Sequence, residues 1–103
     1  MLFRSFQVHF HAIGDAAVRQ SLDAVEQALV ENGRLGHRHH IAHLQMIDPA
    51  DIPRFKELDV IANFQPLWAY GEELVTEINI PTIGEERAQI GRASCRERVF
   101  RAV

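Results

Sequence analysis

Three short β-prone runs alternate with two helical patterns along this chain. The runs are residues 6–10, 38–43 and 60–64, and the helical patterns begin near Asp15 and Asp51. Loops of only a few residues join them. Alternation of this kind predicts right-handed β-α-β units and therefore an α/β fold with a parallel sheet. A parallel sheet of about three strands has bare edges, so the sequence is predicted to be an excerpt of a larger α/β domain.

The pattern after Asp15 is the clearest helical signal in the sequence. Its apolar residues recur at the spacing of one helical face, and polar residues occupy the other face. The apolar positions are Val18, Leu22, Val25 and Leu29. We expect Asp15 to cap this helix and Gly33 to end it. One side of the helix should therefore face water.

The second helical pattern contains a proline near its start. A regular helix beginning at Asp51 accommodates Pro53, because the first turn needs no backbone donor from it. Its buried side is expected to consist of Ile52, Phe55 and Leu58.

The periodicity weakens after the third strand. We expect a helix over residues 70–78, a loop over 80–84 and another helix over 85–90. From Arg92 the composition changes abruptly, with four Arg and one Glu in residues 92–103 and no apolar face continuing from before. We interpret this tail as non-native sequence, with a genuine basic helix end as the alternative, and assign no function to its cysteine.

Composition excludes several classes of protein. Apolar residues make up 47% of the chain and charged residues 24%, which is an ordinary globular balance. The net charge of −3 gives no basic footprint for nucleic acid. No apolar run approaches the ~18 residues of a membrane span, and a single cysteine forms no internal disulfide. The opening residues lack a signal-peptide cleavage site, so we expect a cytoplasmic location.

Histidines are the unusual feature, with six in the chain. His11 lies at the carboxyl end of the first predicted strand, and His43 occupies the equivalent position of the second. Neighbouring parallel strands lie about 4.8 Å apart, so these imidazoles can converge on one cation. Neutral imidazole is a preferred zinc ligand. The pair predicts a divalent metal site, most simply for zinc, although a lone histidine at a strand end is more often a hydrogen-bonded loop residue.

The remaining histidines are expected to play other roles. His9 lies one layer below His11 and could orient it. His39 should share the face of His43 but lie deeper, in core packing or hydrogen bonding to a ligand, whereas His40 should point to the opposite face. His37 falls in the preceding turn. A free-standing histidine-rich metal-binding module and a non-catalytic structural fragment remain the alternatives.

Two further side chains are candidates for contact with a substrate. Gln65 ends the third strand, as the two histidines end theirs, and could donate a hydrogen bond to substrate. Trp68, with Tyr70, could line the mouth of a pocket. Strand punctuation and ordinary packing are the corresponding alternatives.

Several of these segments together resemble a known family. Residues 8–15 (VHFHAIGD) are similar to the HAIGD segment of metal-dependent amidohydrolases, in the amidohydrolase family 3 branch that contains N-substituted formamide deformylase. Residues 38–45 (RHHIAHLQ) resemble the next motif of that branch. Residues 51–55 and 60–69 are also similar, and the motifs occur in the family's order over about residues 5–91.

The resemblance implies a fold and a ligand set. The family fold is a (β/α)8 TIM-type barrel with an extra small β-domain, of which this chain would supply about strands five to seven. His11 would be the metal ligand of strand five and His43 that of strand six. Ala42 departs from the Glu of many relatives. The paired histidines of strand one, the bridging group of strand four and the aspartate of strand eight have no counterpart here.

The implied reaction is hydrolysis of a carbon–nitrogen bond, of amide rather than peptide type, in a small molecule. The metal would activate water, and the strand-eight aspartate would be the general base. A full barrel takes about 250 residues. Residues 1–91 are therefore predicted to be an inactive barrel fragment whose partner is the remainder of the parent barrel.

Overall fold

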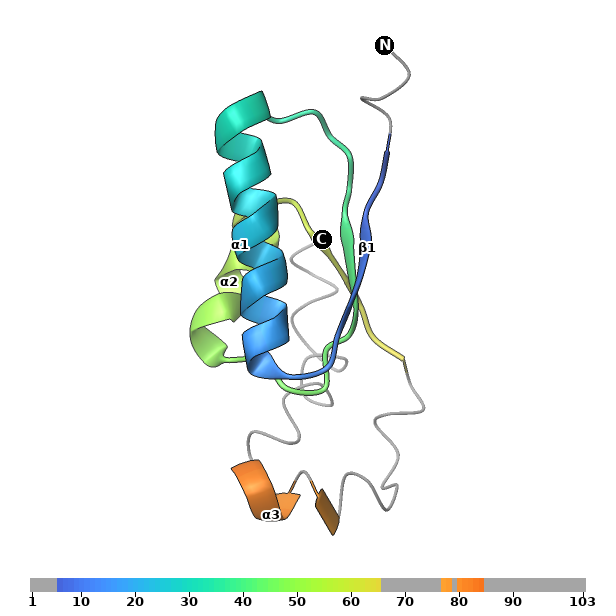
Figure 1. The fold of residues 1–103 in the computed structure, drawn as a ribbon, viewed down its shortest axis with the longest axis vertical. Coiled ribbons are helices and arrows are strands. Elements are labelled where there is room, and N and C mark those ends of the chain that lie inside the picture. Colours follow the sequence, from blue (N-terminus) through green and yellow to red (C-terminus); the bar gives the residue numbers. More distant parts are fainter. Residues whose placement is uncertain (1–5, 66–76, 79, 85–103) are drawn as a thin grey trace.

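The computed structural model describes residues 6–65, 77–78 and 80–84 (Figure 1). The elements in chain order are β1 (His9–Ala12), α1 (Asp15–Asn32), β2 (His40–His43), a 3-10 turn η2 (Pro49–Asp51), α2 (Ile52–Glu57), β3 (Ile61–Asn63) and α3 (Ile80–Ile83). The predicted helix over 85–90, most of that over 70–78, the tail at 92–103, Trp68 and Tyr70 lie outside the described residues.

The three strands form one parallel sheet in the order β1-β2-β3, which confirms the predicted topology. Ala12 is the register partner of His43, and Ala42 is that of Asn63. Both α1 and α2 lie on one side of the strands (Figure 1). This arrangement is consistent with part of a (β/α)8 barrel, in which helices cover the outer face of the sheet.

The core lies between α1 and the sheet. Val18 and Leu22 of α1 have no exposed surface, and neither has Ile41 of β2. The helical face read from the apolar spacing is therefore the buried one, with Leu29 partly buried at its end. Removing each such side chain from water contributes about 1.5–3 kcal/mol to folding.

Glycines occupy the capping positions at both ends of α1. The capping position belongs to Gly14, so the prediction that Asp15 caps the helix is wrong. Asp15 is the first helical residue, and its Oδ1 accepts from Ala16 N at 2.8 Å. Its negative charge still lies in the first turn, where the helix dipole favours it. Gly33 ends the helix as predicted, at φ 76°, with its N–H donating to Leu29 O.

The second helix begins one residue later than predicted. A 3-10 turn precedes α2, capped by Asp48, whose Oδ1 accepts from Ala50 N at 2.9 Å. Pro53 lies in the first turn of α2, as expected. Phe55 is buried, while Ile52 and Leu58 are partly buried against the same core.

A buried carboxylate joins the two helices. Asp51, whose side chain is 4% exposed, accepts from Arg19 Nε at 2.9 Å and pairs with Arg54 at 3.2 Å. The hydrogen bond to Asp51 raises the pKa of Arg19. Arg54 also pairs with Asp23 and Glu26 of α1. The segment that follows β2 is thereby tied to α1.

Residues 80–84 were expected to form a loop, and this expectation is wrong. Ile80–Ile83 form the single-turn helix α3. Pro81 fits because the first turn requires no donor from it. Gly84, at φ 85°, closes the turn by donating to Ile80 O at 2.9 Å. In the described ranges, none of the helices has the length and apolar character that crossing a membrane requires.

Candidate functional site

Two imidazoles meet at the carboxyl end of the sheet. His11 Nδ1 lies 2.8 Å from His43 Nε2, and the ring centroids are 4.9 Å apart with planes tilted by 45°. One ring comes from β1 and the other from β2. The sequence-based expectation that these side chains converge therefore agrees with the observed geometry.

The backbone of His43 produces this meeting. Strand alternation alone would place its side chain on the same face as those of Ile41 and of its register partner Ala12, which are buried in the core. His43 instead has φ 78°, and the following Leu44 has φ 52°. The chain thus leaves β2 in a left-handed conformation that turns the imidazole toward His11. Such φ values cost about 1–2 kcal/mol each for residues with a Cβ and concentrate at functional sites.

Gln65, two residues after β3, contacts His43 of this pair. Its Oε1 lies 2.6 Å from His43 Nδ1, on the far side of the ring from His11. An amide oxygen can only accept, so His43 Nδ1–H donates to it. Gln65 was expected to donate to a substrate, but its carbonyl oxygen is directed at a histidine instead. The prediction that Gln65 lies at this edge agrees with the structure.

His9 and His40 extend the pair into a row of rings. The His9 ring stacks on that of His11, with centroids 5.6 Å apart and planes at 14°. His40, the register partner of His9, lies 5.6 Å from it. The prediction that His40 and His43 point to opposite faces is wrong, because the alternation ends at the left-handed His43.

His39 belongs to a different environment. Its Nδ1 accepts from Val8 N at 3.1 Å, and its ring lies edge-on to His37 at 5.4 Å. Burial lowers the pKa of His39, and the charges of His37 and His40 act in the same direction. The described contacts of His39 are thus with the β1 backbone and the preceding loop rather than with the His11–His43 pair.

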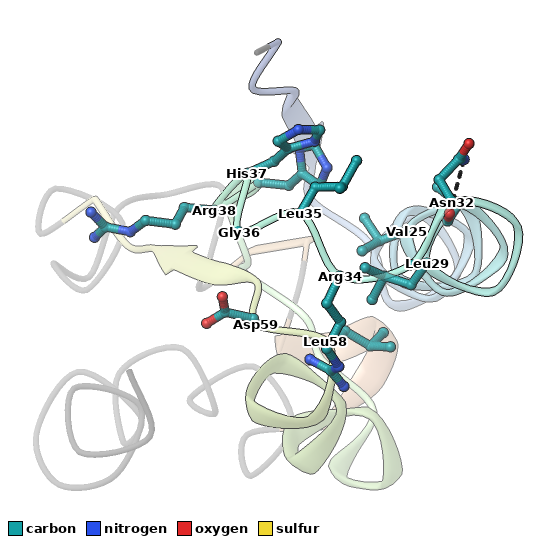
Figure 2. Close-up of a pocket in the computed structure, with 13 residues that line it drawn as sticks. Val25, Leu29, Asn32, Arg34, Leu35, Gly36, His37, Arg38, Leu58 and Asp59 are labelled. Carbon is teal, nitrogen blue, oxygen red and sulfur yellow. Dashed lines mark hydrogen bonds between the residues drawn. The ribbon is translucent and has the colours of Figure 1, made fainter. Parts of the chain in front are cut away.

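A cavity of about 390 Å³ lies at the other end of the strands (Figure 2). The end of α1, the loop before β2 and the turn at Leu58 enclose it. Arg34 runs past Leu58 and donates to the carbonyl of Glu57, while Arg38 points outward (Figure 2). The cavity thus borders the amino ends of β2 and β3 and is separate from the His11–His43 pair.

Gln45 has no role assigned from the sequence, but the structure buries its side-chain amide. The residue is 7% exposed, and neither atom of its side-chain amide has a hydrogen-bond partner among the described residues. It lies two residues after His43. Hydrophobic patterning gives no signal for such a residue, because an isolated glutamine in a loop is normally exposed.

The paired imidazoles fit half of a metal site. Bonds of 2.0–2.1 Å in a tetrahedral zinc site place two nitrogen ligands about 3.3–3.4 Å apart. His11 Nδ1 and His43 Nε2, at 2.8 Å, would need to separate by about half an ångström and to turn both lone pairs toward the metal. Among the described residues, no group of three or more His, Cys, Asp or Glu side chains could hold a metal ion.

Fold and site together define a class of protein. A parallel sheet covered by helices, with polar groups gathered where adjacent strands end, is the architecture of α/β enzymes whose sites lie at the carboxyl edge. The model of the amidohydrolase family matches residues 4–95, so the chain belongs to this family.

A curated relative shares part of this sequence. The chain is 40% identical over 60 residues to Protein LONG AFTER FAR-RED 3 of Arabidopsis thaliana. The match covers 58% of the chain and 10% of the relative, so the aligned part is about a tenth of that protein. No solved structure matches the chain significantly.

Proposed function

We propose that this chain is part of a metal-dependent hydrolase in which His11 and His43 hold a divalent metal, zinc in the first instance. The whole protein would hydrolyse a non-peptide carbon–nitrogen bond of amide type, as in the branch that contains N-substituted formamide deformylase. The 2.8 Å approach of the two ring nitrogens is the observation that carries the proposal. Membership of the amidohydrolase family supports the reaction class.

In this proposal the residues around His11 and His43 either bind the metal or hold a metal-binding ring in place. His11 and His43 supply nitrogen ligands, and a divalent metal held there lowers the pKa of bound water toward about 7 and polarises a carbonyl. The His9 ring supports that of His11 by stacking. Gln65 holds His43 by its ring N–H. Trp68, outside the described residues, is proposed to line the substrate entrance.

The described residues do not supply a complete metal site. A catalytic zinc has three protein ligands and a water, so at least one further ligand has to come from another segment. The general base would likewise come from the remainder of the barrel. The chain by itself is therefore proposed to be inactive, with the rest of the parent barrel as its structural partner and a small amide as its substrate.

Metal analysis of the full-length parent protein tests the ligand assignment, because the described residues lack a third ligand. We expect the parent to bind zinc, and His11→Ala and His43→Ala in the parent each to lose it. His37→Ala is the matched control, because His37 lies outside the pair and should leave binding intact. If His37→Ala abolishes binding and the other two variants retain it, the metal-binding module around residues 37–40 is the better proposal. If the full-length parent keeps its zinc in both the His11→Ala and the His43→Ala variants, the two-histidine assignment fails.

Turnover is tested in the full-length parent protein. Replacing the residues equivalent to His11 and His43 should remove metal and amide hydrolysis together. Unaltered metal content and unaltered turnover would favour the non-catalytic structural fragment instead.

A further inference from the structure

We propose that Gln65 is a positioning residue that fixes the tautomers of both histidines in the pair. The Gln65 oxygen, two residues beyond β3, selects the Nδ1–H form of His43, and His43 in turn selects the Nδ1–H form of His11. The role of Gln65 toward the rings stands on their geometry alone. Its consequence for a metal rests on the proposed function.

With both rings neutral, the two hydrogen bonds together assign a proton to each ring. Gln65 Oε1 accepts at 2.6 Å, so the proton of His43 is on Nδ1. A neutral imidazole carries only one N–H, which leaves the Nε2 of His43 with a lone pair. His11 Nδ1 lies 2.8 Å from that lone pair and must therefore be the donor. One side-chain oxygen thus sets the protonation of two rings.

The sheet explains why Gln65 can reach His43. Ala42 and Asn63 are register partners in the parallel pair β2–β3, so the next residues of both strands leave the sheet at the same edge. His43 leaves in a left-handed conformation, while Gln65 follows Asn63 by two residues. The side chain of Gln65, just beyond β3, thereby reaches Nδ1 of His43 at the end of β2.

The two histidines are consequently unequal as ligands. His43 presents its Nε2 lone pair toward His11 without any rearrangement. His11 directs an N–H at the same place, so its proton has to leave Nδ1, for Nε2 or for solvent, before both nitrogens can accept a cation. A hydrogen-bonded outer nitrogen also fixes the orientation of a ligating ring and raises its basicity.

Nitrogen chemical shifts of the imidazole rings measure the tautomers directly. We would record long-range proton–nitrogen spectra of the labelled full chain, without metal, at a pH well above the ordinary histidine pKa of about 6.5. The rings of His11 and His43 are assigned from their alanine variants. Both are expected to show a protonated Nδ1 and an unprotonated Nε2. A protonated Nε2 on His43 in the unmodified chain overturns the inference without reference to any variant.

Two substitutions of Gln65 distinguish the effect of its hydrogen-bond acceptor from that of its side-chain size. Gln65→Leu removes the acceptor and should shift His43 away from the Nδ1–H form, with His11 following. Gln65→Glu keeps an acceptor and should retain it. Gln27→Leu is the matched control, because Gln27 lies on α1 and contacts Glu31. An unchanged His43 tautomer in a folded Gln65→Leu chain would overturn the proposal.

Zinc titration of the same variants in the full-length parent separates this inference from the proposed function. Losing such a hydrogen-bonding partner typically weakens metal binding 10- to 100-fold. We expect a loss of at least about 10-fold in Gln65→Leu and little change in Gln65→Glu. If the chain shows the expected tautomers but the full-length parent binds no zinc, the proposed function is contradicted and the positioning role of Gln65 stands.

Discussion

His43 pairs by register with Ala12 in the parallel sheet, yet its imidazole contacts that of His11. The left-handed backbone at His43, with φ 78°, reconciles these two facts. The site therefore depends on a local conformation that opposes the preference of a residue with a Cβ.

That conformation gives a prediction about stability. His43→Gly and His43→Ala both remove the imidazole, but only glycine adopts φ 78° without a steric penalty. We expect the glycine variant to be more stable than the alanine variant by about 1 kcal/mol in urea denaturation. His40→Gly and His40→Ala provide the control, because His40 lies in β2 and glycine should there be the less stable of the two. Equal stability of the two His43 variants would contradict the strain argument.

The same residue shows how far the sequence could predict the structure. The apolar spacing of α1, the stop at Gly33 and the parallel order of the strands follow from periodicity and turn chemistry, and all three are confirmed. The convergence of His11 and His43 was predicted from the rule that parallel strands end at one edge, but the two residues are not equivalent by register, and the left-handed backbone at His43 brings the rings together. The prediction that His40 and His43 point to opposite faces failed at His43, because period-two alternation holds only while the backbone stays extended.

Other features had no local signal in the sequence. The direction of the Gln65 amide depends on how three strands align, which is a relationship between segments distant in the chain. The burial of Asp51 depends on two arginines, one of them on another helix. Pattern rules assign charged residues to the surface, and they fail where charge pairing replaces water.

Asp51 provides a second prediction. Asp51→Asn removes the negative charge from a side chain that is 4% exposed and bonded to Arg19 and Arg54. Hydrogen bonds to charged groups contribute about 1.5–3 kcal/mol, so we expect the free energy of unfolding to fall by about 2 kcal/mol. Asp23→Asn is the control, since the Asp23 side chain is 58% exposed and should contribute less than about 1 kcal/mol. Similar losses in the two variants would argue against a special role for the buried carboxylate.

The amide of Gln45 provides a third prediction. Both of its polar atoms are buried without a partner in the part of the chain that the structure describes, and a buried unsatisfied group costs about 1–3 kcal/mol. Gln45→Met keeps the approximate length of the side chain and removes the amide. We expect it to raise the free energy of unfolding by about 1 kcal/mol or more. Gln20→Met, on the exposed face of α1, should change it by less than about 0.5 kcal/mol. Destabilisation by Gln45→Met would show that the amide stabilises the fold.

The low pKa of His39 makes the stability of the chain depend on pH. Burial, with the charges of His37 and His40 adding to it, lowers the pKa of His39 in the folded state. The Nδ1 of His39 also accepts from Val8 N, and a protonated ring has no acceptor to offer. Below pH of about 6.5 the unfolded chain binds a proton at this residue that the folded chain resists. The unfolded state then holds more protons, so the free energy of unfolding rises with pH across this window.

Urea denaturation between pH 8 and pH 5 checks this dependence. Stability should be fully present above pH of about 6.5, fall as the pH drops toward the lowered pKa of His39, and level off below it. His39→Gln should reduce the slope, because its amide can replace the acceptor and does not titrate. His9→Gln is the control and should retain the slope, since His9 does not contribute to the low pKa of His39. A slope that survives in His39→Gln, or that disappears in His9→Gln, would assign the pH dependence to other groups.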